Sequence, residues 1–141
     1  MSTHRQLLGR KGEEIAERFL IQKNYEIIQR NYRRYRGEID LIAKDGDCLV
    51  FVEVKSVSSD RFGSPINKVN EQKRKQLGKI AMAYYQEFDL FDQDSRFDIV
   101  TVIFNGSKYI VDHIENAFWL ENSSRNLNLD FTHGKLVNGL L

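Results

Sequence analysis

The sequence predicts an α/β domain in which a mixed five-stranded sheet is flanked by helices. Two segments, at about residues 5–23 and 68–88, repeat apolar residues at the spacing of an α-helix. Five shorter segments are rich in β-branched and apolar residues, which is typical of strands. Because the order is helix, three strands, helix, two strands, we expect one sheet covered by helices, with the order αβββαββ.

The first expected helix ends near Asn24, and its apolar stripe consists of Leu8, Gly12, Ile15, Ala16 and Phe19. Gly12 lacks a side chain, so the helix can approach the sheet closely at that point. The second expected helix carries Lys73 near its start, where an apolar residue is expected. The rest of its stripe consists of Val69, Leu77, Ile80, Ala81, Tyr84 and Phe88.

The expected strands cover residues 25–34, 37–45, 48–56, 96–105 and 108–116. A "DG" pair joins the second strand to the third, which predicts an antiparallel hairpin. An "NGS" turn joins the last two strands. After Phe118 the apolar pattern fades. We therefore expect one domain over residues 1–118 and a C-terminal tail without predicted structure over residues 119–141.

The composition indicates a cytoplasmic protein with no membrane partner. No apolar run is long enough to cross a bilayer, and the first residues lack the apolar core of a signal peptide. The single cysteine, Cys48, has no partner for an internal disulfide, which agrees with a reducing compartment. The three histidines show no spacing typical of metal ligands.

Charged residues interrupt two of the apolar strands, with Asp40 in the second and Glu53 and Lys55 in the third. Side chains alternate along a strand, so Glu53 and Lys55 share one face. If the hairpin brings Asp40 beside Glu53, two like charges meet in a partly apolar setting, and a divalent cation relieves their repulsion. Mg²⁺ prefers such oxygen ligands, and Lys55 would lie close enough to orient an attacking water.

Glu13 is a third candidate ligand because it lies at the edge of the first helix's apolar stripe, where it can point toward the same site. Glu38 is expected to be solvated, and Asp98 is expected to be structural, paired with an arginine. A simpler interpretation makes Glu53 and Lys55 an ordinary charged pair on a solvent-facing side of the sheet.

Two basic segments are candidates for binding a phosphate backbone, although the formal net charge is only +1. "RNYRRYR" interleaves arginines with tyrosines, and "KVNEQKRKQLGK" opens the second helix. Such clusters bind phosphates and bases, but they are also compatible with simple solvated faces. The candidate residues are Arg30, Arg33, Arg34, Arg36, Lys73 and Arg74.

The Asp, hairpin, Glu-x-Lys arrangement resembles the PD-(D/E)XK nuclease superfamily. More narrowly, "GRKGEEIA", "RNYRRYRGEIDLIA", "VFVEVK", "FGSP", "RFDIV" and "HIENAF" occur in the order seen in YraN-type proteins. These are small bacterial proteins predicted to be endonucleases and similar to archaeal Holliday-junction resolvases. The resemblance spans about residues 9–118, although Ile39 stands where the superfamily has a proline.

The resemblance implies a restriction-endonuclease-like fold and a Mg²⁺- or Mn²⁺-dependent endonuclease that acts on DNA. Asp40, Glu53 and the backbone carbonyl of Val54 would bind the metal, Glu13 would complete the acidic cluster, and Lys55 would position the water. Resolvase-like enzymes often act as dimers, so a homodimer is a candidate state. The alternatives are a catalytically silent nucleic-acid-binding module on the same fold and a scaffold protein whose carboxylates form salt bridges.

Overall fold

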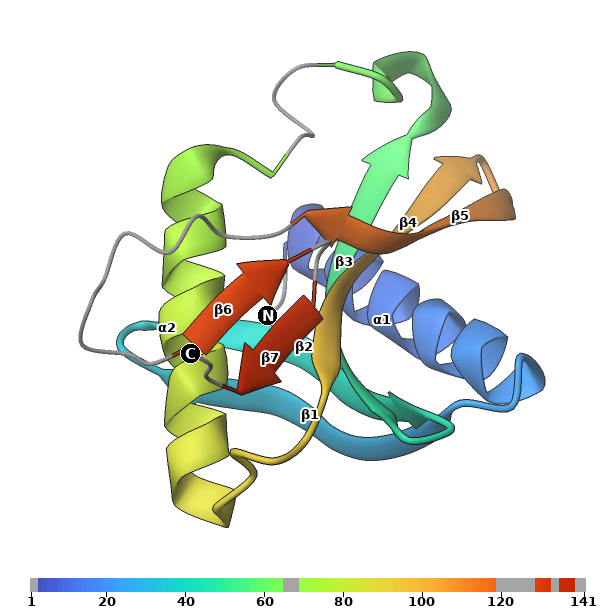
Figure 1. Ribbon diagram of the computed structural model, residues 1–141. Helices are drawn as coiled ribbons and strands as arrows, with labels where there is room; N and C mark the ends of the chain where they lie inside the picture. Colours follow the sequence, from blue (N-terminus) through green and yellow to red (C-terminus); the bar gives the residue numbers. More distant parts are fainter. Residues whose placement is uncertain (1–2, 65–68, 119–128, 133–134, 139–141) are drawn as a thin grey trace.

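The computed structural model describes residues 3–64, 69–118, 129–132 and 135–138 (Figure 1). Its elements are α1 (His4–Gln22), β1 (Glu26–Arg34), β2 (Gly37–Asp45), β3 (Cys48–Ser58), the short 3₁₀ helix η1 (Ser59–Arg61), α2 (Glu71–Phe88), β4 (Ser95–Asn105), β5 (Lys108–Phe118), β6 (Leu129–Thr132) and β7 (Lys135–Asn138). The predicted order αβββαββ is confirmed as far as β5.

The strands form one mixed sheet. Its order is β1-β2-β3-β4-β7-β6, and β5 also pairs with β4. Among the described strands, only β3 and β4 run parallel to each other. β7 pairs with Ser95 and Arg96 at the start of β4, and β5 pairs with β4 from Phe97 onward. The hairpin of β6 and β7 therefore extends the predicted five-stranded sheet, from within the segment in which the sequence predicted no structure.

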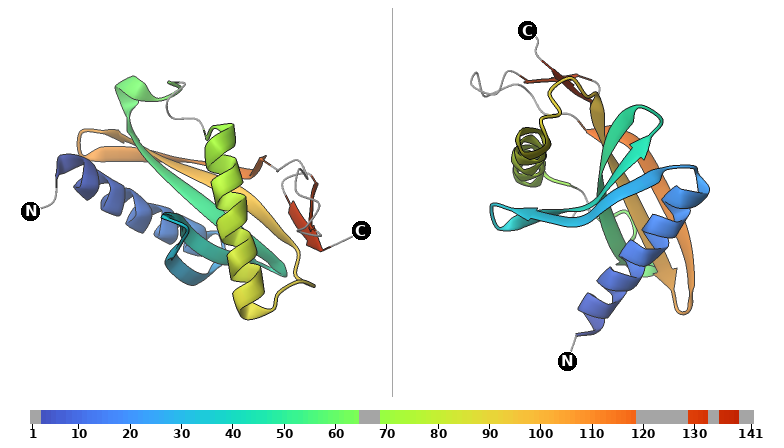
Figure 2. Two further views of the ribbon diagram at one scale, coloured as in Figure 1. Left: turned by 90° about the vertical axis from the view of Figure 1, so that its left-hand side faces the viewer. Right: turned by 90° about the horizontal axis from the view of Figure 1, so that it is seen from below.

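The two helices cover opposite faces of the sheet, so the domain has three layers (Figure 2). On one face, α1 buries Ile15, Ala16 and Leu20 against apolar residues of β2, β3 and β4. On the other face, α2 packs an aromatic-rich cluster against the sheet, with Phe51, Phe97, Tyr84 and Tyr85 among its members. Neither helix is long and apolar enough to cross a membrane, as judged over the described residues.

The predicted close approach at Gly12 is confirmed. A Cβ atom at Gly12 would lie 1.9 Å from the Oγ atom and 3.1 Å from the Cβ atom of Ser56 on β3. A side chain there would require Ser56 or α1 to shift. The glycine therefore fixes how deeply α1 sits, and with it the position of the neighbouring Glu13.

Two strands diverge at the point where the candidate acids lie. Pairing between β2 and β3 runs from the hairpin only as far as Leu41 and Val52, so the first residues of β2 separate from the second half of β3 (Figure 1). The ladder between β1 and β2 also lacks a pair at Asn31 and Asp40, and Asn31 has a left-handed φ of 51°. The sheet thus opens around Asp40.

Candidate functional site

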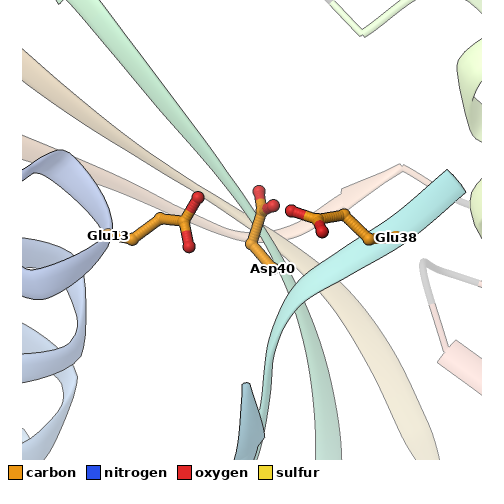
Figure 3. Close-up of side chains that lie close together, drawn as sticks. All are labelled: Glu13, Glu38 and Asp40. Atoms are coloured by element: carbon orange, nitrogen blue, oxygen red, sulfur yellow. The ribbon is translucent and has the colours of Figure 1, made fainter. Parts of the chain in front are cut away.

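Three carboxylates meet at the opening between β2 and β3. Glu13 of α1 and Glu38 and Asp40 of β2 each offer an oxygen atom, and these atoms lie within 4.8 Å of one another (Figure 3). Glu13 approaches Asp40 from the helix side, and Glu38 approaches it from the opposite side. The cluster is thus built from elements that are separate in the sequence and joined only by the fold.

Asp40 is the buried centre of the group. Its side chain is only 7 % exposed, and its Oδ2 atom accepts a hydrogen bond of 2.7 Å from the Val54 N–H. The ladder between β2 and β3 ends at the pair of Leu41 and Val52. Asp40 and Glu53 are the next residues beyond this pair and are equally buried, so the two carboxylates face each other. Burial and the adjacent Glu53 raise the pKa of Asp40 to about 9. Without a cation, Asp40 therefore retains a proton at neutral pH and hydrogen-bonds Glu53.

A neutral donor, the side chain of Asn31, bridges Glu13 and Glu38. The side-chain amide of Asn31 donates to Glu13 at 3.0 Å and to Glu38 at 3.2 Å, and Arg33 donates to Glu38 at 2.9 Å. Burial raises the pKa of Glu13, with further contributions from Glu38 and Glu53. Burial acts in the same direction on Glu38, but hydrogen bonds from Arg33 and Asp40 outweigh it and lower the pKa of Glu38.

Two lysines accompany Glu53. Lys73 of α2 places its Nζ atom 3.6 Å from the Glu53 carboxylate. This contact explains why a lysine interrupts the apolar stripe of the second helix. Lys55 lies two residues beyond Glu53 on β3 and is half-buried, on the same face of the strand.

The donor set fits a hard divalent cation. Asp40 carries a strongly raised pKa because like charges and burial act on it together, and a cation would stabilise its charged form. All the side-chain donors that meet there are carboxylate oxygens, the ligand type that Mg²⁺ and Mn²⁺ prefer. The contact of Val54 with Asp40 is made by its N–H, and the role of its carbonyl as a ligand stays a prediction.

The basic residues named in the sequence are mostly paired with acids. Arg30 forms an ion pair with Glu17, Arg33 pairs with Glu38, and Arg34 pairs with Glu87. Arg36 is exposed at the turn between β1 and β2, and Arg74 donates to the Val69 carbonyl at 3.1 Å. Exposed ion pairs contribute little stability, so these arginines can exchange a carboxylate for a phosphate at small cost.

Sequence reasoning missed two residues of the site. Glu38 was expected to be solvated, but it lies within the acidic cluster. Asn31 was not singled out, but it links Glu13 to Glu38. Asparagine tolerates left-handed backbone better than most residues, so an asparagine inside a predicted strand was the available signal.

Asp98 belongs to a different, structural network, as predicted. It is fully buried and pairs with Arg96 at 3.0 Å. The Nε2 atom of His113 lies 2.8 Å from Asp98 Oδ2, and the Asn116 N–H donates to Asp98 Oδ1 at 3.2 Å. These contacts join β4 to β5 away from the acidic cluster.

Fold and site together define an α/β protein with a restriction-endonuclease-like arrangement and a carboxylate cluster where two strands diverge. The chain matches the family described as "Uncharacterised protein family UPF0102" over residues 12–102. It therefore belongs to the UPF0102 family, which confirms the YraN-type resemblance.

Similar proteins come from several bacteria. A UPF0102 protein of Geobacter metallireducens is 40 % identical over 120 residues, which cover 85 % of this chain and 98 % of the relative. One of Chlorobium phaeobacteroides is 44 % identical over 117 residues, with coverages of 79 % and 93 %. One of Thermodesulfovibrio yellowstonii is 43 % identical over 112 residues, with coverages of 79 % and 96 %. The family is uncharacterised, so membership assigns no activity.

Proposed function

We propose that the protein is a metal-dependent phosphodiesterase, an endonuclease that cleaves DNA with Mg²⁺ or Mn²⁺. The observation that carries this proposal is the convergence of Glu13, Glu38 and Asp40 within 4.8 Å, with Glu53 hydrogen-bonded to Asp40. So many buried or half-buried carboxylates at one point destabilise the fold unless a charge compensates for them. A site that is costly to maintain in this way favours a functional role.

Asp40 and Glu53 would hold the cation, with Glu13, the carbonyl of Val54 and now Glu38 as further ligands. When bound there, the cation supplies Lewis-acid polarisation of the phosphodiester and makes a water more acidic. Asp40 must release its proton for this, and it keeps its orientation through the Val54 N–H.

The basic residues would act on the substrate. Lys55 is placed to orient the attacking water or to offset charge on the phosphate, because it shares the face of Glu53 one strand step away. Lys73, which pairs with Glu53, would be free to contact phosphate if a cation took over that carboxylate. The exposed arginines Arg30, Arg33, Arg34 and Arg36, together with Arg74 on α2, would hold the DNA backbone.

The alternative is a catalytically silent nucleic-acid-binding module on the same fold. The contact between Lys73 and Glu53 favours it, because a lysine already compensates for one of the acids without a metal. The two functions differ in turnover, since both require DNA binding and only the enzyme requires the acidic cluster to bind a cation. A homodimer remains a prediction for either function.

Cleavage of a panel of labelled DNAs, linear, nicked, flapped and branched, in Mn²⁺ tests the proposal. We expect at least one substrate to be cut and Asp40→Asn to abolish cleavage. Asp47→Asn is the matched control, because it makes the same chemical change at an exposed turn of the same hairpin. DNA binding without cleavage of any substrate would support the silent module, and equal cleavage by Asp40→Asn and the wild type would contradict the assigned site.

A further inference from the structure

A cavity of about 310 Å³ opens on the α2 face of the sheet, beside the acidic site. Its floor consists of Ile99 and Thr101 of β4 and Asp112 and Ile114 of β5. Its surrounding residues include Val57, Phe62, Val69, Arg74, Ala117 and Phe118. It is therefore mainly apolar and aromatic, with the Thr101 hydroxyl and the Asp112 carboxylate in its floor and the Arg74 guanidinium among the surrounding residues.

The strand registers tie this cavity to the proposed catalytic residues. Glu53 of β3 pairs with Ile99, and Ile99 pairs with Ile114, so the three form one row across the sheet. Lys55, Thr101 and Asp112 form the next row. Residues paired in register share a face. Each row thus begins at a proposed catalytic residue and ends in the floor of the cavity.

The geometry matches the reach of one nucleotide. Neighbouring strands lie about 4.8 Å apart, so the cavity floor extends from roughly 5 to 10 Å beyond Glu53 and Lys55. A phosphodiester at those residues could therefore place an attached base over β4 and β5. The first turn of α2 contacts both the acidic site and the cavity, because Lys73 contacts Glu53 while Arg74 borders the cavity.

We propose that the cavity accepts one unstacked nucleobase of the DNA substrate. The inference rests on the proposed function and adds the substrate class, namely DNA with an unpaired nucleotide at the cleavage point. Ile99 and Ile114 of the floor and the ring of Phe62, which is 54 % exposed, supply apolar surfaces for stacking a base. Thr101 and Asp112 offer the base edge a donor and acceptors, and Arg74 offers a phosphate contact.

Preference among DNAs follows from the cost of unstacking. A fully paired duplex must break pairing and stacking to fill the cavity, whereas a mismatched or unpaired nucleotide enters at much lower cost. Stacking of one base on an aromatic side chain typically changes affinity by a factor of ten or more. We therefore expect about tenfold tighter binding to a duplex with one unpaired nucleotide than to the perfect duplex.

The test measures binding of the full chain to both duplexes by fluorescence anisotropy in EDTA, which prevents metal-dependent cleavage. Ile114→Glu places a carboxylate in the floor of the cavity at a position that is 47 % exposed, and should abolish the preference. Ile110→Glu is the matched control, with the same change on the same strand and face, 66 % exposed and outside the cavity lining. Thr101→Val removes one hydroxyl at nearly constant shape and should reduce the preference.

The outcomes separate this inference from the proposed function. A preference in wild type and Ile110→Glu that is lost in Ile114→Glu supports the nucleobase site. Salt-dependent binding with equal affinity for both duplexes overturns the nucleobase site and leaves the endonuclease proposal standing. A preference that survives in both Ile114→Glu and Thr101→Val also overturns it. Absence of binding to any DNA overturns both.

Discussion

Replacing Asp40 by asparagine should stabilise the metal-free protein while removing its ability to be stabilised by metal. Asp40 holds its proton in the folded state, with a pKa raised to about 9 from a reference value of 3.8. Asparagine resembles the protonated acid in shape and charge. Its carbonyl can accept from the Val54 N–H, and its amide can donate to Glu53, as the proton of Asp40 does.

The size of this stabilisation follows from the difference in bound protons between the folded and the unfolded wild-type protein. Between about pH 4 and pH 9 the folded protein holds a proton that the unfolded chain has released, so the free energy of unfolding falls as the pH rises through this window. At pH 7 the penalty reaches at most about 4 kcal/mol, at 1.36 kcal/mol for each pH unit above the unfolded pKa. Asparagine reproduces the contacts of the protonated acid only in part, so we expect a gain of about 2 kcal/mol in Asp40→Asn, or roughly 5–10 °C in Tm.

Thermal unfolding in EDTA at several pH values between 5 and 8 measures this effect. The stability gained by Asp40→Asn should grow with pH, whereas Asp47→Asn at the exposed hairpin turn should follow the wild type. Addition of Mn²⁺ should raise the Tm of the wild type and of Asp47→Asn, and leave Asp40→Asn unchanged. A lower Tm of Asp40→Asn in EDTA, or a difference that does not vary with pH, would refute the reasoning.

Three further outcomes are expected. Lys55→Ala should slow single-turnover cleavage by about 10²–10³-fold at unchanged DNA affinity, with Lys55→Arg recovering only part of the rate; a rate within twofold of wild type would remove Lys55 from the mechanism. Replacing Arg33 and Arg34 together by alanine should weaken DNA binding and flatten its dependence on salt in titrations, because fewer counterions are released; an unchanged slope would place the binding face elsewhere. Gly12→Ala should lower the free energy of unfolding in urea by about 1–3 kcal/mol, and Ser56→Ala should restore part of it by removing the Oγ atom; wild-type stability of Gly12→Ala would contradict the close approach of α1.

The placement of Asp40 beside Glu53 could be predicted because a two-residue turn fixes the register of a hairpin. The "DG" pair predicts the hairpin, and the two turn residues are Gly46 and Asp47. Asp45 therefore pairs with Cys48, and counting back from this pair brings Asp40 opposite Glu53. The close approach at Gly12 could be predicted too, because a glycine on the apolar stripe of a helix removes side-chain bulk from the face that packs. In both cases the informative residues are close in the sequence or act through local geometry.

Alternation puts Glu38 on the same face as Asp40, but its position near the strand start indicated a solvated side chain, because its contacts with Asn31 and Arg33 form only when β1 pairs with β2. The irregularity beside it could not be predicted, since regular alternation would put Ile39 and Ile42 on opposite faces, but both belong to the core cluster under α2. The acidic partners of the arginines could not be predicted from the sequence either, since Arg34 and Glu87 meet only when α2 is packed on the sheet.

The acidic cluster depends on the docking of α1 against the sheet. Glu13 lies on α1, which is held to the sheet by the apolar contacts of Ile15, Ala16 and Leu20 and by the fit of Gly12 over Ser56. The strands that receive α1 are synthesised later, and β4 must be in place before that face is complete. A nascent or damaged chain with α1 undocked therefore carries an incomplete set of carboxylates. Glu13 therefore joins Glu38 and Asp40 only when α1 is packed on the sheet.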